Sequence, residues 1–481
     1  MPQLVILDEV NCKFENLEPQ HRRYLHNKSR VYDPASRWSP AVEMGRWDGC
    51  TAYFSMAGQT YINLLPSMLD YLDSQGVYLE LIDKRTYNRD FSFAAIRKNE
   101  VSCFNWDNGD PVILKDHQVV AANKMLENLQ GIVQLPTGAG KSLLTAVLSR
   151  KVEKYGRTIV IVPNRDLIDQ TLSYYKMLGL DVGVYSGAKK EFFHTHTICT
   201  WQSLGSLKKK AITVGNETID FARYIQGVVG VIVDESHGVR GKVLKDLLCD
   251  DFANIPIRWG LTGTIPKQKH EFINLEISLG EVFHKVHTSE LVSSGQLVQA
   301  EVSVIQLVDA RTFNSYHDEF SYLVGDRARM GVIANLITEI ASSGNTLVLV
   351  ARVNTGELLE SLIPNSVFLN GAASSKTRKS HYDMALADSN KIIIATDKIA
   401  AVGVDIPYLY NLVFVQAGKS FIQTVQAIGR ALRKPEGKDR ASVWDICSTC
   451  KWSKKHLADR KKYYKEQQFP FSVIKYEWSN D

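Results

Sequence analysis

The sequence predicts an α/β protein in which two parallel-sheet domains follow one another behind a small α+β domain. Two series of largely apolar runs carry this prediction, and helix-like segments separate the runs within each series. The first series comprises residues 158–163, 197–200, 228–235 and 258–264, and the second comprises 346–351, 366–371, 391–396, 411–416 and 442–447. Strands that are apolar along their whole length are buried on both faces, as in a parallel sheet covered by helices.

The length of 481 residues suits about three domains. We expect a substrate-binding N-terminal domain over residues 1–105, a first parallel-sheet domain over 106–285 and a second over 286–450. In the N-terminal domain, two short strand-like runs flank a helix-like segment that ends near Gly76. Residues 451–481 are expected to form a basic tail. A run of basic residues such as 451–465 more often forms a solvated charged helix than a binding site.

A glycine-rich stretch, QLPTGAGKS at residues 134–142, lies between a strand-like run at 131–133 and a helix-like run at 143–148. Gly138 and Gly140 let backbone N–H groups approach phosphates closely, and the helix N-terminus adds partial positive charge. Lys141 can reach the β- and γ-phosphates of a nucleotide, and the Ser142 hydroxyl can ligate Mg²⁺. An ordinary glycine-rich turn is the alternative, but this pattern between a strand and a helix favours a nucleotide.

Two carboxylates, Asp234 and Glu235, end one apolar run of the first series. A carboxylate at the end of a strand beside such a loop is placed to hold Mg²⁺ through water, and the next can orient or deprotonate the attacking water. Hydrolysis also needs positive charge near the γ-phosphate. Arg430 and Arg433 in the second domain are three residues apart and share one helix face. The alternatives are strand-capping acids and a surface charge pair.

The composition predicts a soluble cytoplasmic protein with reduced thiols. No apolar run approaches the roughly 20 residues of a membrane span, and the N-terminus lacks the pattern of a secretory signal. The seven cysteines are scattered. The CxxC pair, Cys447 and Cys450, has no second pair nearby, so we expect buried thiols rather than a zinc site.

The net charge of +5 is concentrated in two segments, 21–47 and 451–481, which carry +4 each. Two basic segments around a nucleotide-binding core predict a polyanionic partner. Within the first segment basic and aromatic residues interleave, and Arg46 with Trp47 can grip phosphate and stack on bases. A solvated basic surface with Trp47 in the core is an equal alternative.

Many short elements, in one order over residues 112–450, resemble the motifs of the superfamily 2 helicases. His117-Gln118 resembles the element whose glutamine reads adenine, and residues 135–142 resemble motif I although Leu135 replaces the usual Gly or Ala. Residues 162–170 and 199–204 resemble motifs Ia and Ic. Residues 234–237, DESH, resemble a DEAH-like motif II, and 261–264, LTGT, stand where motif III stands. In the second domain, residues 347–351, 394–407 and 426–433 resemble motifs IV, V and VI.

The resemblance implies two RecA-like domains and an ATP-dependent, Mg²⁺-requiring helicase. It implies ATP contacts from Gln118, Pro136, Thr137, Gly138, Ala139, Gly140, Lys141, Ser142, Gly403 and Asp405, and Mg²⁺ ligation by Ser142 and Asp234. It implies hydrolysis by Lys141, Asp234 and Glu235 with Gln426, Arg430 and Arg433 from the second domain. By the same resemblance, Thr262 and Thr264 couple hydrolysis to movement, and Arg165, Thr200, Gln202 and Thr396 line the nucleic-acid face.

The N-terminal GRWDG, together with NLLPSMLDYL, resembles the front domain of phage UvsW-type recombination helicases, which are similar in activity to RecG. That resemblance implies remodelling of branched or forked DNA: Holliday-junction branch migration, fork regression and D-loop unwinding in recombination, repair and replication. It also places the protein in the host cytoplasm if a phage encodes it, and we expect a monomer. An RNA helicase, or a nucleotide-gated clamp with little unwinding, is the alternative.

Overall fold

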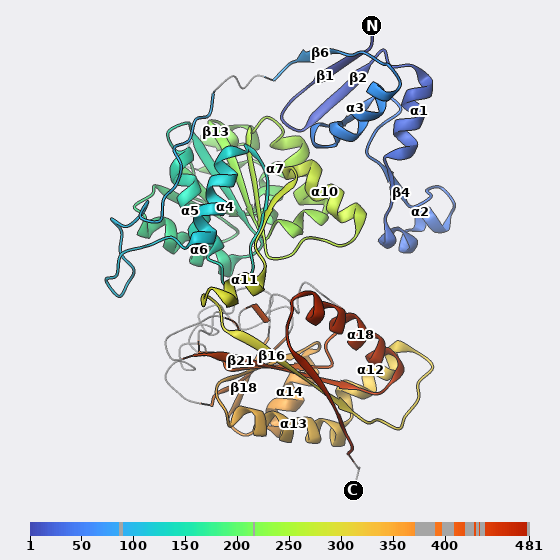
Figure 1. Ribbon diagram of the computed structural model, residues 1–481, viewed down its shortest axis with the longest axis vertical. Helices are drawn as coiled ribbons and strands as arrows, with labels where there is room; N and C mark the ends of the chain where they lie inside the picture. The colour runs from blue at the N-terminus through green and yellow to red at the C-terminus, as the bar shows by residue number, and fades with distance from the viewer. Residues whose placement is uncertain are drawn as a thin grey trace. The chain divides into compact units, whose positions relative to one another are not determined.

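The computed structural model describes residues 1–85, 90–214, 217–370, 390–396, 408–418, 428–429, 432 and 438–478. The chain divides into two compact units, one of Met1–Leu135 with Gly140–Lys285 and one of Pro136–Ala139 with Val286–Asp481 (Figure 1). None of the helices in the described ranges is long and apolar enough to cross a membrane.

The first unit begins with a small α+β module. Its sheet has the order β5-β2-β1-β6, from β1 (Gln3–Ile6), β2 (Asn11–Glu15), β5 (Gln59–Tyr61) and β6 (Glu80–Asp83). Two helices, α1 (Pro19–Lys28) and α3 (Leu65–Ser74), each have a proline in the first turn, where its missing N–H costs no hydrogen bond. Apolar side chains of these helices, including Leu25 and Met68, form one core with Phe14.

An arm of residues 30–52 leaves this module between its first helix and β5. Its base is a two-stranded ladder of β3 (Arg30–Tyr32) and β4 (Cys50–Ala52). Two short helical segments, η1 (Pro34–Trp38) and α2 (Pro40–Glu43), lie between these strands (Figure 1).

A seven-stranded parallel sheet forms the centre of the first unit, in the order β15-β7-β14-β13-β8-β10-β9. Its strands are β7 (Gln130–Gln134), β8 (Arg157–Val162), β9 (Val182–Tyr185), β10 (His196–Thr200), β13 (Val228–Asp234), β14 (Ile257–Thr262) and β15 (Val282–Lys285). Every residue of β13 is buried, as its continuous apolar run predicts.

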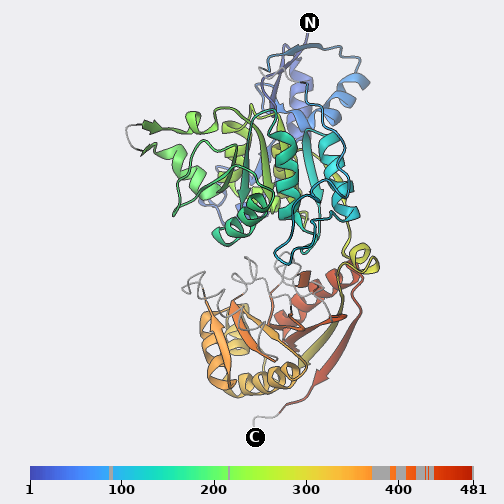
Figure 2. The same ribbon diagram turned by 90° about the vertical axis from the view of Figure 1, so that its left-hand side faces the viewer.

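Helices accompany this sheet, and one of them lies almost wholly in the core. The helices are α4 (Asp116–Glu127), α5 (Lys141–Val152), α6 (Arg165–Met177), α7 (Trp201–Lys209), α8 (Phe221–Ile225), α9 (Lys242–Asp246) and α10 (Lys269–Leu279). Ten residues of α5 are buried, so the helix that follows the glycine-rich stretch is fixed against the sheet. A hairpin of β11 (Ile212–Val214) and β12 (Glu217–Ile219) projects from this unit (Figure 2).

The second unit contains another seven-stranded parallel sheet, in the order β18-β19-β17-β20-β21-β16-β22. Its strands are β16 (Gln299–Leu307), β17 (Thr346–Val350), β18 (Ser366–Leu369), β19 (Ile392–Thr396), β20 (Asn411–Val415), β21 (Arg440–Ser448) and β22 (Phe471–Tyr476). Two parallel sheets behind a small α+β module confirm the predicted fold class.

Helices lie on both faces of the second sheet. Helices α13 (Arg327–Ala341) and α14 (Val353–Leu362) lie on one face, and α18 (Lys451–Glu466) lies on the other (Figure 1). Two further helices, α11 (Thr288–Ser293) and α12 (Tyr316–Gly325), flank β16 in the sequence.

The segment 451–481, expected to be a basic tail, instead contributes α18 and β22 to the second unit. The Arg460 side chain is buried, and its Nε and Nη2 donate to the two carboxylate oxygens of Asp445 on β21 at 2.8 Å each. The Tyr464 hydroxyl donates to the same carboxylate at 3.0 Å. The basic charge pattern of the segment suggests a solvated surface, and it does not show that Arg460 is buried against the Asp445 carboxylate.

Candidate functional site

The glycine-rich stretch turns from β7 into α5, as its sequence predicts. Gly138 and Gly140 have φ values of +86° and +79°, in the left-handed region that favours glycine. No side chain caps the first turn of α5, which begins at Lys141. The N-terminal N–H groups of a helix in this situation are suited to an anion such as phosphate.

Lys141 lies at the centre of a buried polar cluster in the first unit. Its Nζ is 3.3 Å from Glu235 Oε1 and donates to the carbonyl of Leu135 at 3.5 Å. Gln118 on α4 is held beside the same turn, because its Oε1 accepts from Lys115 N at 2.9 Å and its Nε2 donates to Gly140 O at 3.4 Å. The structure therefore brings Gln118, Gly140, Lys141 and Glu235 together.

The two carboxylates at the end of β13 are both desolvated. Burial raises the pKa of Asp234, and the negative charge of Glu235 raises it further. Burial also acts to raise the pKa of Glu235, but the positive charges of Lys141 and His237 outweigh it and lower this pKa well below its usual range. Glu235 has a φ of +50°, a left-handed conformation that is uncommon for a residue with a side chain.

This cluster fits a divalent cation. Two adjacent buried carboxylates face one ammonium group, so full ionisation leaves negative charge that a bound cation compensates. The pKa of Asp234 is raised mainly because burial disfavours its charged form, and the neighbouring negative charge of Glu235 adds to this effect. Ser142 follows Lys141 in the first turn of α5, and its side chain is largely buried.

His237 joins this cluster to the following strand, a role that the sequence reasoning did not assign. Its Nδ1 is 3.3 Å from Glu235 Oε2 and 3.1 Å from Thr262 Oγ1 at the end of β14. The Thr262 hydroxyl donates to Thr264 O at 2.9 Å and accepts from Thr264 N at 3.2 Å. The last position of the DESH run was the available signal, since it lies two residues after Glu235.

Five candidate residues of the second domain lie outside the described residues: Gly403, Asp405, Gln426, Arg430 and Arg433. Their placement in the site stays a prediction. Pro136, Thr137 and Ala139 are described, and with Gly138 they group with the second unit.

Comparisons with known proteins identify both parallel-sheet domains. Residues 112–267 match the family model of the type III restriction enzyme, res subunit, and residues 328–435 match that of the helicase conserved C-terminal domain. The ATP-dependent DNA helicase uvsW of Enterobacteria phage T4 is 26% identical over 467 residues, which cover 89% of this chain and 87% of that protein. The chain belongs to the superfamily 2 helicases.

Two further proteins are similar to this chain. The DNA 3'-5' helicase XPB of Kineococcus radiotolerans is 23% identical, over 75% of this chain and 64% of that protein. The structure of S. cerevisiae Dbp5 bound to RNA and ADP BeF3 has a TM-score of 0.56 at 15% identity, over 76% of this chain and 90% of that one. The likeness to Dbp5 shows the fold alone, and the family assignment confirms the expected ATP-dependent helicase class.

Three of this helicase's expected nucleic-acid contacts lie near the C-terminal ends of two neighbouring strands of the first sheet. Arg165 starts α6 after β8, and Thr200 ends the neighbouring strand β10 with Gln202 just beyond it. Arg165 and Gln202 are exposed, whereas Thr200 is buried and its hydroxyl caps α7 by accepting from Ser203 N at 3.4 Å. Thr396, in the other unit, ends β19 and is half-buried.

The two tryptophans of the arm differ in how far they are buried. Trp47 is half-buried, and its indole N–H donates to Cys50 O at 2.8 Å, so it holds the base of the arm. Arg46 is exposed. Trp38 is 74% exposed and has the Arg37 guanidinium 4.7 Å above its ring. Trp38 belongs to the same run of interleaved basic and aromatic residues as Trp47, and it is the more exposed of the two tryptophans.

Proposed function

We propose that the protein is an ATP-dependent DNA helicase or translocase. The observation that carries this proposal is the buried cluster in which Lys141 lies 3.3 Å from Glu235 at the start of α5. This cluster joins a phosphate-binding turn to a pair of carboxylates, which is the arrangement that nucleoside triphosphate hydrolysis needs. The similarity to the DNA helicase of phage T4 supports DNA as the polymer.

The roles of the residues follow from their positions. Lys141 neutralises charge on the β- and γ-phosphates, and the N–H groups at the start of α5 hold the phosphate oxygens. Glu235, kept ionised by Lys141 and His237, accepts a proton from the attacking water or orients that water. Gln118 is placed to read the adenine. Ser142 and Asp234 would hold Mg²⁺, which neutralises charge developing on the phosphates.

We propose further that the substrate is branched or forked DNA, with branch migration, fork regression and D-loop unwinding as the reactions. The match to the phage T4 helicase supports this, because it extends over 467 residues and so reaches beyond the two parallel-sheet domains. In this proposal the arm supplies DNA contacts through Arg46, Arg37 and Trp38. The protein acts as a monomer in the cytoplasm, that of the host cell if a phage encodes it.

The test is steady-state ATP hydrolysis with four ligands of equal length: single-stranded DNA, linear duplex, a four-way junction and single-stranded RNA. The expected result is the largest stimulation with the junction. Stimulation by RNA above all DNA ligands would replace DNA with RNA as the substrate. Tight DNA binding without ATP turnover would instead indicate a nucleotide-gated clamp.

A further inference from the structure

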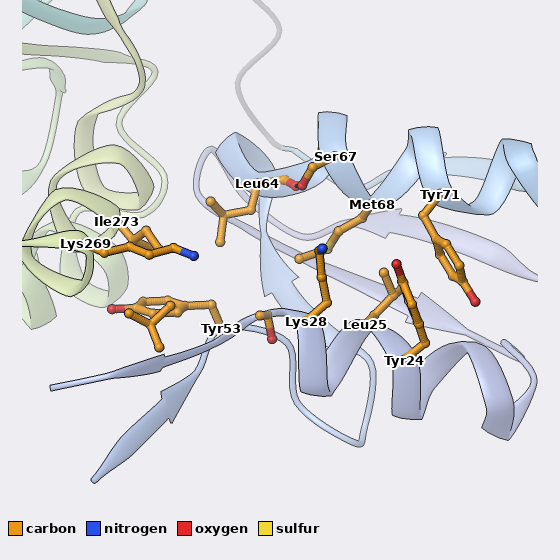
Figure 3. A pocket seen from close by; sticks show the side chains of 12 residues that line it. Tyr24, Leu25, Lys28, Tyr53, Leu64, Ser67, Met68, Tyr71, Lys269 and Ile273 are labelled. Carbon is orange, nitrogen blue, oxygen red and sulfur yellow. The ribbon is translucent and has the colours of Figure 1, made fainter.

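A pocket in the first unit lies between the small α+β module and the parallel-sheet domain. Helices α1 and α3 form its walls on the module's side, and α10 forms the wall on the other side (Figure 3). The cavity volume is about 170 Å³. Leu25, Leu64, Met68 and Ile273 give the pocket an apolar lining. An apolar cavity of about 150 Å³ holds one benzene ring, so this one suits a single flat aromatic group.

Tyrosines in fixed orientations also line this pocket. Tyr24 and Tyr71 are stacked, with ring centroids 3.9 Å apart and planes 15° apart. The Tyr71 hydroxyl and His21 Nδ1 hydrogen-bond at 3.1 Å, which holds the pair in place. Tyr24 is 43% exposed, so it is accessible from solvent. Preordered aromatic side chains of this kind are stacking partners for nucleic-acid bases.

The charged side chains that line the pocket are two lysines. Lys28 is the last residue of α1 and Lys269 the first of α10, and their side chains approach the pocket from opposite sides (Figure 3). Both are exposed, and within the described part of the chain neither is paired with a carboxylate. An apolar, tyrosine-lined cavity between two unpaired ammonium groups is complementary to an aromatic group that carries phosphate.

We propose that this pocket binds one nucleotide of a single DNA strand, with the base against the apolar wall and tyrosines and the flanking phosphates at Lys28 and Lys269. This inference rests on the proposed function, because it names the part of the DNA substrate that the α+β module binds. Lys269 begins α10 five residues after Thr264. An occupied pocket therefore restrains the segment that leads from the Thr262–Thr264 hydrogen bonds, so strand binding here also stimulates ATP hydrolysis.

The decisive experiment compares three variants of the full chain: Tyr24→Ala, Lys28→Ala/Lys269→Ala and Arg23→Ala. Arg23 is a matched control, because it is exposed on the same helix as Lys28 and does not line the pocket. Binding of fluorescent oligothymidine is measured at fixed salt. Tyr24→Ala is expected to weaken binding at least about fivefold, as for loss of one stacked base. The double lysine variant is expected to lose more affinity per charge than Arg23→Ala.

Photocrosslinking of oligonucleotides with 5-iodouracil then locates the strand. A crosslink to peptides of α1 or α3, lost in Tyr24→Ala, supports the proposal. Crosslinks confined to other parts of the chain overturn it, and so does a double lysine variant that loses no more affinity per removed charge than Arg23→Ala. Displacement of the crosslink by thymidine monophosphate as readily as by oligothymidine would overturn it too, in favour of a free nucleotide. Thermal unfolding of each variant shows that it remains folded.

ATP hydrolysis by the same variants separates the two proposals. If DNA stimulates the wild-type protein and the pocket variants equally, the pocket proposal fails and the helicase proposal stands. If neither DNA nor RNA stimulates hydrolysis by the wild-type protein, the proposed function itself fails.

Discussion

His237 Nδ1 lies 3.1 Å from Thr262 Oγ1, and through this contact the carboxylate run after β13 touches the end of β14. The same ring nitrogen is 3.3 Å from Glu235 Oε2. We propose that a change in the position of Glu235 on loss of the γ-phosphate moves the side chain of His237, which contacts Thr262; the Thr262 hydroxyl in turn hydrogen-bonds to the backbone of Thr264. Such a chain of polar contacts is a physical route from hydrolysis to movement.

Replacing His237 with Ala is expected to lower the amount of DNA unwound per ATP more than the rate of hydrolysis. The reason is that Lys141 remains beside Glu235 while the link to Thr262 is lost. Strand separation and phosphate release measured in the same samples give this ratio. His194→Ala is the control, because that histidine pairs with Asp181 at the surface. An unchanged ratio in His237→Ala would remove the coupling role.

Replacing Lys141 with Ala is expected to reduce ATP hydrolysis at least about a hundredfold, the scale of losing one charge-stabilising group in a transition state. DNA binding without nucleotide should be largely retained, since the proposed nucleic-acid contacts, such as Arg165 and Gln202, do not include Lys141. Phosphate release and fluorescence anisotropy measure the two quantities. The exposed Lys124, on α4, provides the control substitution to Ala. Normal turnover by the Lys141 variant would contradict the phosphate-binding assignment.

Replacing Arg460 with Met is expected to cost about 3–5 kcal/mol in the stability of the second unit, because Asp445 then remains buried without its cation. Chemical denaturation followed by circular dichroism measures the loss. Lys455→Ala, on the exposed part of the same helix, should change stability little.

A double variant, Arg460→Met with Asp445→Leu, tests the reason for that loss. It should recover much of the stability, since an apolar pair of similar size avoids the unpaired charge. A double variant as unstable as the single one would mean that packing of Arg460, and not its charge, holds α18 in place.

Acid is expected to destabilise the first unit partly through His196. This side chain is fully buried on β10, Thr158 Oγ1 is 2.6 Å from its Nδ1, and burial lowers its pKa despite the nearby Glu153. A histidine with a lowered folded pKa binds fewer protons folded than unfolded. Its contribution to stability is therefore present above the unfolded pKa of about 6.5 and lost as pH falls below it.

The check is the melting temperature of wild-type protein and His196→Asn between pH 7.5 and pH 5. The melting temperature of the wild-type protein should fall further over this interval than that of the variant. Equal losses would place the acid sensitivity in other groups.

The sequence predicts those parts of the molecule that depend on neighbours along the chain. The β7–α5 turn is an example, since Gly138, Gly140 and the start of α5 are local and each has its own physical signature. The wholly buried strands are another, because continuous apolar runs specify burial on both faces.

Features that join distant segments could not be predicted in this way. The His237–Thr262 contact spans 25 residues, and Arg460 pairs with a carboxylate that an apolar run conceals. β16 escaped prediction because its first half alternates between exposed and buried residues at what looked like a domain junction. The pocket at Tyr24 joins residues more than 200 positions apart, and no pattern within either segment signals it.

The position of β16 in the second sheet has a consequence for synthesis of the protein. β16 pairs with β21 on one side and β22 on the other, and β21 follows it by about 140 residues. A ribosome adding 5–20 residues per second therefore leaves both edges of β16 unpaired for roughly 7–30 seconds. During that interval the nascent chain exposes a nine-residue strand, with a buried, mostly apolar second half, that can pair with other chains. The yield of folded protein should consequently depend on chaperones and on temperature during expression.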